Sequence, residues 1–140
     1  MIQRERITSS DWMDDRLAPN FQRYEFACRC GCGYADPTPA LVAALQRVRN
    51  CMQAAVHVES GCRCKRHNDA TPGASKDSQH LTGNAADIHT DGHFNRLMVC
   101  VKADEAFANG GVGVYARQLP ERPTPWLHVD VRGYRVRWEG

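Results

Sequence analysis

The sequence predicts an α+β fold in which a small antiparallel sheet carries helices on one face. Two segments, 38–52 and 93–108, place apolar residues at helical spacing. Other segments show the alternation or the β-branched residues that are typical of short strands, namely 55–59, 85–89, 112–115, 126–131 and 134–138. The 140 residues are enough for one domain with a hydrophobic core around a site.

The chain is predicted to begin with an N-terminal arm, residues 1–27, that packs on a domain formed by residues 28–140. The arm is polar with scattered aromatic side chains, and we expect little regular structure in it. The segment CRCGCG at 28–33 is too rich in glycine for a helix or a regular strand, so a loop is predicted there.

The helix at 38–52 has both a start signal and an apolar stripe. Pro37 and Pro39 bracket its first residues. The stripe consists of Leu41, Val42, Leu45, Val48 and Met52. After the strand at 55–59, the polar stretch 60–78 contains a Pro-Gly pair and predicts a loop with one helical turn.

The second half of the domain is predicted to follow the order strand, helix, strand and hairpin. The helix at 93–108 ends at a pair of glycines, 110–111. The strands at 126–131 and 134–138 are separated only by Arg-Gly at 132–133, which predicts that they pair with each other as a hairpin.

Composition and charge exclude some classes of function. Apolar residues make up 42% and charged residues 24%, as in an ordinary soluble domain. The net charge of +2 is too small to indicate nucleic acid binding, and the basic cluster Arg132, Arg135 and Arg137 is interpreted as a solvated strand edge. The first 15 residues hold no apolar run, and no stretch approaches the ~20 apolar residues of a membrane span. We therefore expect cytoplasmic synthesis without an export signal or membrane insertion.

The chain has seven cysteines, and because this number is odd at least one thiol lies outside any intramolecular disulfide. Without an export signal, reduced thiols are expected. Cys51 and Cys100 lie on apolar helix faces and are predicted to be buried small hydrophobic residues.

The other cysteines allow a metal interpretation. The CxCxC pattern of Cys28, Cys30 and Cys32 lacks the two-residue gap that is common in zinc-binding motifs. Cys62 and Cys64 could approach it from the later loop. A disulfide or a second metal would then tie the N-terminal loop to that later loop.

The segment SQHLTGNAADI, residues 78–88, offers an imidazole at His80 and a carboxylate at Asp87. Zinc accepts such donors, and a catalytic site uses three protein ligands and leaves the fourth position to water. In WLHVDV, strand alternation puts His128 and Asp130 on one face, which makes His128 the candidate third ligand. By spacing alone, His80 and Asp87 are also compatible with ordinary polar loop residues.

The pattern SxHxxGxAxD, met by residues 78–87, resembles the signature of the D-alanyl-D-alanine carboxypeptidase-like zinc peptidases, in their phage and bacterial branch, which share a fold with the hedgehog signalling domain. The segment ESGCRCKRHN is similar to the SGxR segment of that family. FACRCGCG resembles a cysteine-rich stretch of the branch, and GVGVY followed by WLHVDVRGYRVRW resembles its closing strands. The resemblance runs from about Phe26 to Trp138.

This resemblance implies a hydrolase in which His80, Asp87 and His128 bind Zn²⁺ and Arg63 contacts a substrate carboxylate or the oxyanion. Ser78 is a candidate substrate-binding residue beside Arg63, although a loop hydrogen bond is the favoured role of its hydroxyl. The implied substrate is the stem peptide of bacterial peptidoglycan, cut by zinc-activated water at a D,D bond or an L-alanyl-D-glutamate bond.

The general base departs from the family pattern. Many relatives place Glu or Asp three residues before the last histidine ligand, but Pro125 stands there. Asp130 is the best substitute as the catalytic proton acceptor. It could instead orient His128 from behind, or be the metal ligand itself while His128 handles the proton.

Two other classes of function remain open. A zinc-stabilised module could hold wall peptide without cutting it, which Pro125 favours, and a redox or metal-handling protein could be built on the cysteines. For the peptidase, we expect a monomer that reaches the cell wall after release, as an endolysin, or as a phage virion component.

Overall fold

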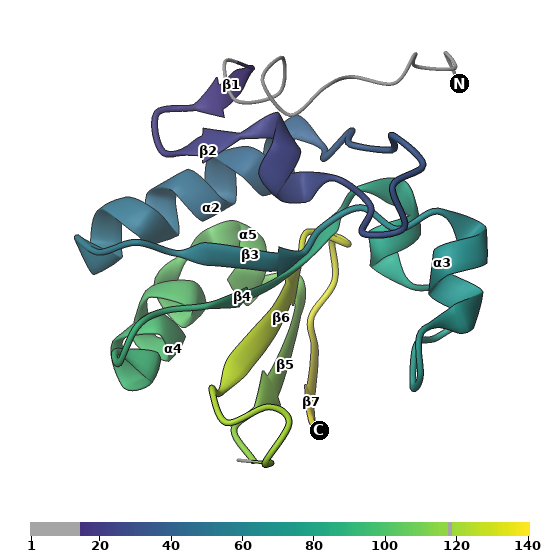
Figure 1. Ribbon diagram of the computed structural model, residues 1–140. Coiled ribbons are helices and arrows are strands. Elements are labelled where there is room, and N and C mark those ends of the chain that lie inside the picture. The colour runs from purple at the N-terminus through teal and green to yellow at the C-terminus, as the bar shows by residue number, and fades with distance from the viewer. Residues whose placement is uncertain (1–14, 118) are drawn as a thin grey trace.

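A mixed sheet of β-strands forms the centre of the computed structural model, which describes residues 15–117 and 119–140 (Figure 1). Its strand order is β3-β4-β6-β5-β7. The strands are β3 His57–Ser60, β4 Ala85–His89, β5 Gly111–Tyr115, β6 Trp126–Asp130 and β7 Val136–Glu139. Neighbouring strands are antiparallel except β5 and β7, which are parallel. The predicted α+β class is therefore confirmed, with one parallel pair that was not expected.

Three helices, α2 Pro39–Met52, α4 Phe94–Ala103 and α5 Glu105–Ala108, pack together against the sheet, while α3 Lys65–Ala70 lies apart from them (Figure 1). The sheet contributes Ala86 and Ile88 of β4 and Leu127 and Val129 of β6 to the hydrophobic core. Because side chains alternate along a strand, the residues between them face away from this core. No helix in the described ranges is long and apolar enough to span a membrane.

Helix α2 begins and ends close to where the sequence predicts. The Thr38 side chain accepts a hydrogen bond from the backbone N–H of Leu41, and Pro39 takes the first helical position. The helix ends at Gln53, which has a left-handed backbone conformation. The predicted helix at 38–52 and the predicted strand at 85–89 are thus confirmed.

The predicted helix at 93–108 is wrong in its continuity, because the chain breaks at Asp104 into α4 and α5. Asp104 has extended backbone angles, and its carboxylate accepts a hydrogen bond from the N–H of Ala106 at the start of α5. The same carboxylate forms an ion pair with Arg47 of α2, at 2.6 Å. A short acidic side chain competes with the helical backbone for hydrogen bonds, and here it starts a second helix.

The predicted hairpin of 126–131 with 134–138 is also wrong, because β7 pairs with β5 and not with β6. Arg137 of β7 donates hydrogen bonds to the carbonyl oxygens of Gly110 and Ala108, which lie at the end of α5. These bonds hold β7 beside β5. The pattern of apolar residues in a strand does not specify which neighbour it pairs with.

Part of the predicted N-terminal arm, residues 1–14, lies outside the described residues. The rest contains more regular structure than predicted: strands β1 Arg16–Ala18 and β2 Phe21–Gln22, then the 3₁₀ helix η1 Arg23–Phe26. Phe21 and Phe26 are fully buried in the same core as α2. The described part of the arm therefore completes the core.

The predicted loop at 60–78 contains α3, and a second 3₁₀ helix, η2 Gln79–Thr82, follows it. Cys100 is buried in the core as predicted, but Cys51 and Cys100 are not separate small hydrophobic residues, since a disulfide joins them. Helices α2 and α4 pack side by side and bring the two Cα atoms to 5.8 Å, a separation that a disulfide can bridge. Cys51 is exposed, so it was not a buried apolar residue.

Breaking this disulfide is expected to destabilise the fold. The Cys51→Ser/Cys100→Ser variant should lose about 2–4 kcal/mol of unfolding free energy, because the link constrains the unfolded chain. Urea denaturation with and without a reducing agent measures the loss. The parent should lose stability on reduction and the double variant should not; equal curves for parent and variant under oxidising conditions would contradict the link.

Candidate metal centre

His80 of η2, Asp87 of β4 and His128 of β6 form one buried cluster on the face of the sheet opposite α2, α4 and α5. One nitrogen or oxygen atom from each of the three lies within 4.8 Å of the others. Asp87 and His128 are register partners on neighbouring strands, so the pairing of β4 with β6 sets them side by side. The structure therefore brings together the three residues that the sequence selects as metal ligands.

The local sequence around η2 explains how His80 is placed. The Ser78 hydroxyl accepts a hydrogen bond from the backbone N–H of His80, which starts the short helix. Gly83 ends it with φ of 75°, and a Cβ there would collide with the carbonyl oxygen of Asp36. Ser78 and Gly83 of the motif thus fix the turn that carries the histidine.

In each histidine, the ring nitrogen that points away from Asp87 donates a hydrogen bond to another residue. The Nδ1–H of His80 donates to the carbonyl oxygen of Gly61 at 2.6 Å, and the Nε2–H of His128 donates to Asp130 Oδ2 at 2.7 Å. When each imidazole is neutral, its other nitrogen, His80 Nε2 or His128 Nδ1, carries a lone pair and no hydrogen. Both face the same oxygen, Asp87 Oδ1, at 3.2 Å.

Three electron-pair donors around one point repel one another unless a proton or a metal ion lies between them. Ligands at zinc distances in a tetrahedral site lie about 3.3 Å from one another, close to the 3.2 Å observed between each imidazole nitrogen and Asp87 Oδ1. Two imidazoles and a carboxylate are also a donor set that zinc accepts. The residues fit a zinc ion with an open fourth position.

The pKa values follow from the same contacts. Burial alone would raise the pKa of Asp87, but hydrogen bonds from His128 and His80 outweigh it and hold that pKa well below its usual range. Burial would lower the pKa of His128, but hydrogen bonds to Asp130 and Asp87 raise it above its ordinary value. Asp87 is therefore a carboxylate at neutral pH, and a proton on His128 competes with a metal.

Asp130 lies behind His128 and is fully buried. Besides His128, its carboxylate accepts hydrogen bonds from the backbone N–H of Gly111 at 2.8 Å and from Nε and Nη2 of Arg132 at 2.9 and 2.7 Å. Asp130 is outside the group that could hold a metal and is not among the described residues that line the adjacent pocket. The contact with Nε2 of His128 sets which nitrogen of that ring points to Asp87.

Arg63 reaches the centre from the segment after β3. Its Nη2 donates to Asp87 Oδ2 at 3.1 Å, the oxygen that the histidines leave free. Ser60 and Asn68 accept further hydrogen bonds from Nε and Nη1. An arginine has five N–H donors, so this arrangement leaves donors for a ligand in the pocket that Arg63 lines.

A pocket of about 420 Å³ opens over the three candidate ligands. Arg63, Arg122 and Arg132 line it, as do three aromatic residues, Tyr115, Trp126 and Trp138. Residues 71–75 and 77–79 form another part of its wall, which includes Ser78. The size and lining suit a small polar or charged ligand.

The aromatic wall is held together by its own contacts. Tyr115 and Trp126 stack with their ring centroids 3.9 Å apart, and the Trp138 indole N–H donates to the Tyr115 hydroxyl at 2.8 Å. The Trp138 ring lies 4.9 Å from that of His128. Strand β7 therefore borders the centre because it pairs with β5.

Several of these pocket residues were not predicted from the sequence. Sequence patterns place Tyr115 and Trp138 in strands, Arg132 in a turn and Asp77 in a loop, and they indicate no role in a site for any of these residues. Alternation along 126–130 could have indicated Trp126, because it lies on the same strand face as His128. The other residues reach the pocket through contacts that no local pattern reports.

Metal binding is expected to weaken as the pH falls. Because the pKa of His128 is raised, a proton occupies the ligand nitrogen over a wider pH range than in a free imidazole. Zinc affinity should fall about tenfold for each pH unit below that pKa. Competition titrations with a chromophoric chelator measure the affinity. The His80→Ala variant, which lacks one ligand, measures the zinc that is bound outside this centre. An affinity at this centre that stays constant from about pH 8 to pH 5 would contradict the assignment.

A known protein family matches most of this chain. The model of one protein family, described as Peptidase M15, matches residues 19–130, a range that contains all three candidate ligands and Arg63. A search of curated proteins found no match. Since the family model covers most of the 140 residues, the chain belongs to the peptidase M15 family.

Proposed function

We propose that this chain is a zinc peptidase that hydrolyses a peptide bond in the stem peptide of bacterial peptidoglycan. The observation that carries the proposal is the convergence of His80, Asp87 and His128 at the base of a pocket. Three protein ligands with an open fourth position are the arrangement of catalytic zinc sites, whereas structural sites are closed by four. Peptidases of this family are zinc-dependent in general.

The side chains around the ligands supply binding and charge. A bound zinc ion would activate water and polarise the scissile carbonyl as a Lewis acid. Arg63 is held by hydrogen bonds to Asp87, Ser60 and Asn68, which place its guanidinium group beside the candidate zinc ligands. We assign it to a substrate carboxylate or to the oxygen that becomes negative during the reaction.

The pocket lining supports an anionic peptide as the substrate. Stem peptides carry free carboxylates close to the bonds that wall hydrolases cut. Arg63, Arg122 and Arg132 offer three guanidinium groups in one pocket, and Trp126 and Trp138 offer flat apolar surface beside them. This lining is compatible with a D,D-carboxypeptidase, a D,D-endopeptidase or an L-alanyl-D-glutamate endopeptidase.

A proton acceptor needs access to the pocket. Asp130 is fully buried and its carboxylate already accepts hydrogen bonds from His128, Arg132 and Gly111. We therefore assign Asp130 to holding His128 in its ligand orientation. Among the described lining residues, Asp77 is a carboxylate that is exposed and outside the ligand set. Asp77 is our first candidate for the proton acceptor.

A non-catalytic wall-binding module is the second candidate. Its support is Pro125, which stands where many relatives have an acidic residue. Such a module would bind zinc and stem peptide with the same residues but leave the peptide uncut.

The main test measures metal content and wall cleavage together. The parent should release new amino groups or amino acids from purified peptidoglycan, and His80→Ala should lose at least about 100-fold in rate because one ligand is gone. The matched control is His57→Ala, since His57 is paired with Asp91 outside the pocket. It should cleave at the parent rate.

Wall cleavage by His80→Ala at the parent rate would overturn the proposal. Binding of wall peptide by a zinc-loaded parent that cuts none of the three bond types would instead establish the module. Circular dichroism of each variant confirms that the comparison is between folded proteins.

The roles of the two acidic residues can be separated by kinetics. Asp130→Asn should weaken zinc binding by about 10–100-fold, and excess zinc should recover most of its rate, because Asp130 acts through His128. Asp77→Asn should keep its zinc affinity but lose about 10²–10⁴-fold in kcat. Cleavage by Asp77→Asn at the parent rate would contradict its assignment as the proton acceptor. A rate of Asp130→Asn that stays low in excess zinc would contradict the assignment of Asp130 to holding His128.

A further inference from the structure

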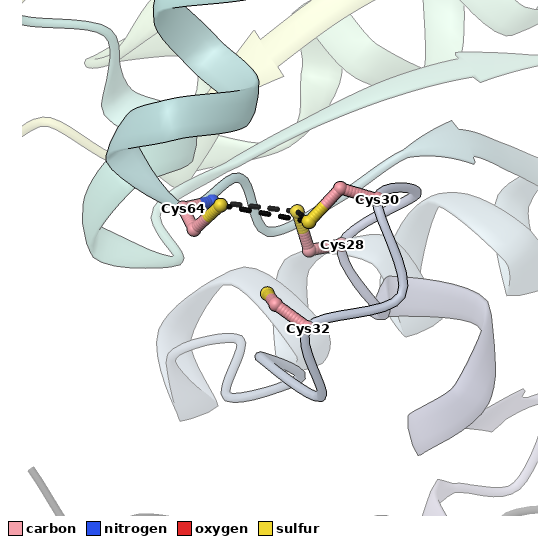
Figure 2. A group of neighbouring side chains, drawn as sticks. All are labelled: Cys28, Cys30, Cys32 and Cys64. Atoms are coloured by element: carbon pink, nitrogen blue, oxygen red, sulfur yellow. Dashed lines mark hydrogen bonds between the residues drawn. The ribbon is translucent and has the colours of Figure 1, made fainter.

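Four cysteine side chains form a second cluster, which shares no residue with the first centre. Cys28, Cys30 and Cys32 come from the loop after η1, and Cys64 stands directly before α3. Figure 2 shows their sulfur atoms turned toward one common space. All four sulfur atoms lie within 4.8 Å of one another.

The sulfur separations match a metal site better than a set of disulfides. Zinc–sulfur bonds of about 2.3 Å in a tetrahedron place neighbouring sulfur atoms about 3.8 Å apart. The observed distances are 3.4 Å from Cys28 to Cys30 and 3.6 Å from Cys30 to Cys64. All four thiols are free, whereas Cys51 and Cys100 of the same chain are bonded to each other.

The surrounding backbone provides donors that favour thiolates. The N–H of Cys64 donates to Cys28 Sγ, and the N–H of His67 donates to Cys64 Sγ, both at 3.4 Å. Gly31, between two of the cysteines, has φ of 81°, which allows the loop to turn its sulfur atoms to one side. N–H donors aimed at sulfur stabilise the negative charge that a metal-bound thiolate retains.

We propose that Cys28, Cys30, Cys32 and Cys64 bind a second zinc ion, with a purely structural role. Four sulfur ligands close the coordination sphere, as in structural zinc sites, and leave no position for substrate or water. The remaining free thiol, Cys62, is buried and is not part of the group. The site therefore takes its ligands from two distant stretches of chain, 28–32 and residue 64.

Such a site would hold the segment that supports the first centre. Arg63, next to Cys64, binds Asp87, and its backbone N–H donates to the carbonyl oxygen of His80 at 3.0 Å. Gly61 of the same segment accepts the hydrogen bond from the His80 ring. Fixing Cys64 to the N-terminal loop thus restricts the residues that orient His80 and present Arg63.

The test counts zinc in variants that separate the two sites. The unsubstituted 140-residue chain, purified with a thiol reductant, should contain two zinc ions, and His80→Ala should keep one. X-ray absorption at the zinc edge of His80→Ala should show a shell of sulfur atoms at about 2.3 Å. Cys32→Ser in the His80→Ala background should lose that zinc; Cys32 is exposed, so its packing is not at stake.

Cys62→Ala in the His80→Ala background is the matched control, and it should keep the sulfur-bound zinc. In the otherwise unchanged chain, Cys32→Ser should raise KM for wall peptide more than it lowers kcat, because Arg63 loses its support.

A His80→Ala protein without bound zinc, or one whose zinc has only nitrogen and oxygen neighbours, would overturn the proposal. So would peptide mapping that finds Cys64 in a disulfide in the freshly purified parent. The zinc counts, the absorption spectrum and the peptide mapping do not depend on peptidase activity, so this proposal can fail while the proposed function stands, and the proposed function can fail while this proposal stands. The KM measurement on Cys32→Ser rests on the proposed function.

Discussion

The arrangement of this domain depends on one electrostatic constraint, the meeting of two imidazole lone pairs at a single carboxylate oxygen. His80 Nε2 and His128 Nδ1 both face Asp87 Oδ1 at 3.2 Å. Each ring is held in that orientation by an acceptor behind it, the carbonyl of Gly61 or the carboxylate of Asp130. Unless a proton or a metal ion lies between them, the three lone pairs oppose one another, and the donor set and spacing suit a metal ion.

The negative charges of the two buried carboxylates near this centre are balanced by arginines. Asp87 and Asp130 are buried acids, and each is paired with an arginine, Arg63 and Arg132 respectively. Buried charges are tolerated when they are paired and hydrogen-bonded. Both arginines also line the pocket. The arginines that pair with the buried acids therefore also present guanidinium groups to the pocket.

Residues 60–64 contact the metal centre, the N-terminal segment and the cysteine cluster. Ser60 accepts a hydrogen bond from Arg63, and Gly61 accepts one from the His80 ring. The backbone N–H of Cys62 donates to the carbonyl oxygen of Phe26 in the N-terminal segment. Cys64 ends the segment at the thiol cluster. The described part of the N-terminal segment is thus part of the support of the centre, and its buried Phe26 packs in the core that carries the sheet.

The amino-acid sequence alone predicts the short-range features of this protein. The Thr38–Pro39 start specifies α2, the alternation of AADIH and WLHVD puts Asp87 and His128 on the polar face, and the Ser78, His80 and Gly83 pattern specifies the turn. Tertiary packing sets the register of Asp87 with His128, the parallel pairing of β7, the Cys51–Cys100 link and the burial of Asp130 behind His128. Local patterns reflect the preferences of neighbouring residues, whereas these features depend on which distant segments pack together, and that choice is made by the whole core.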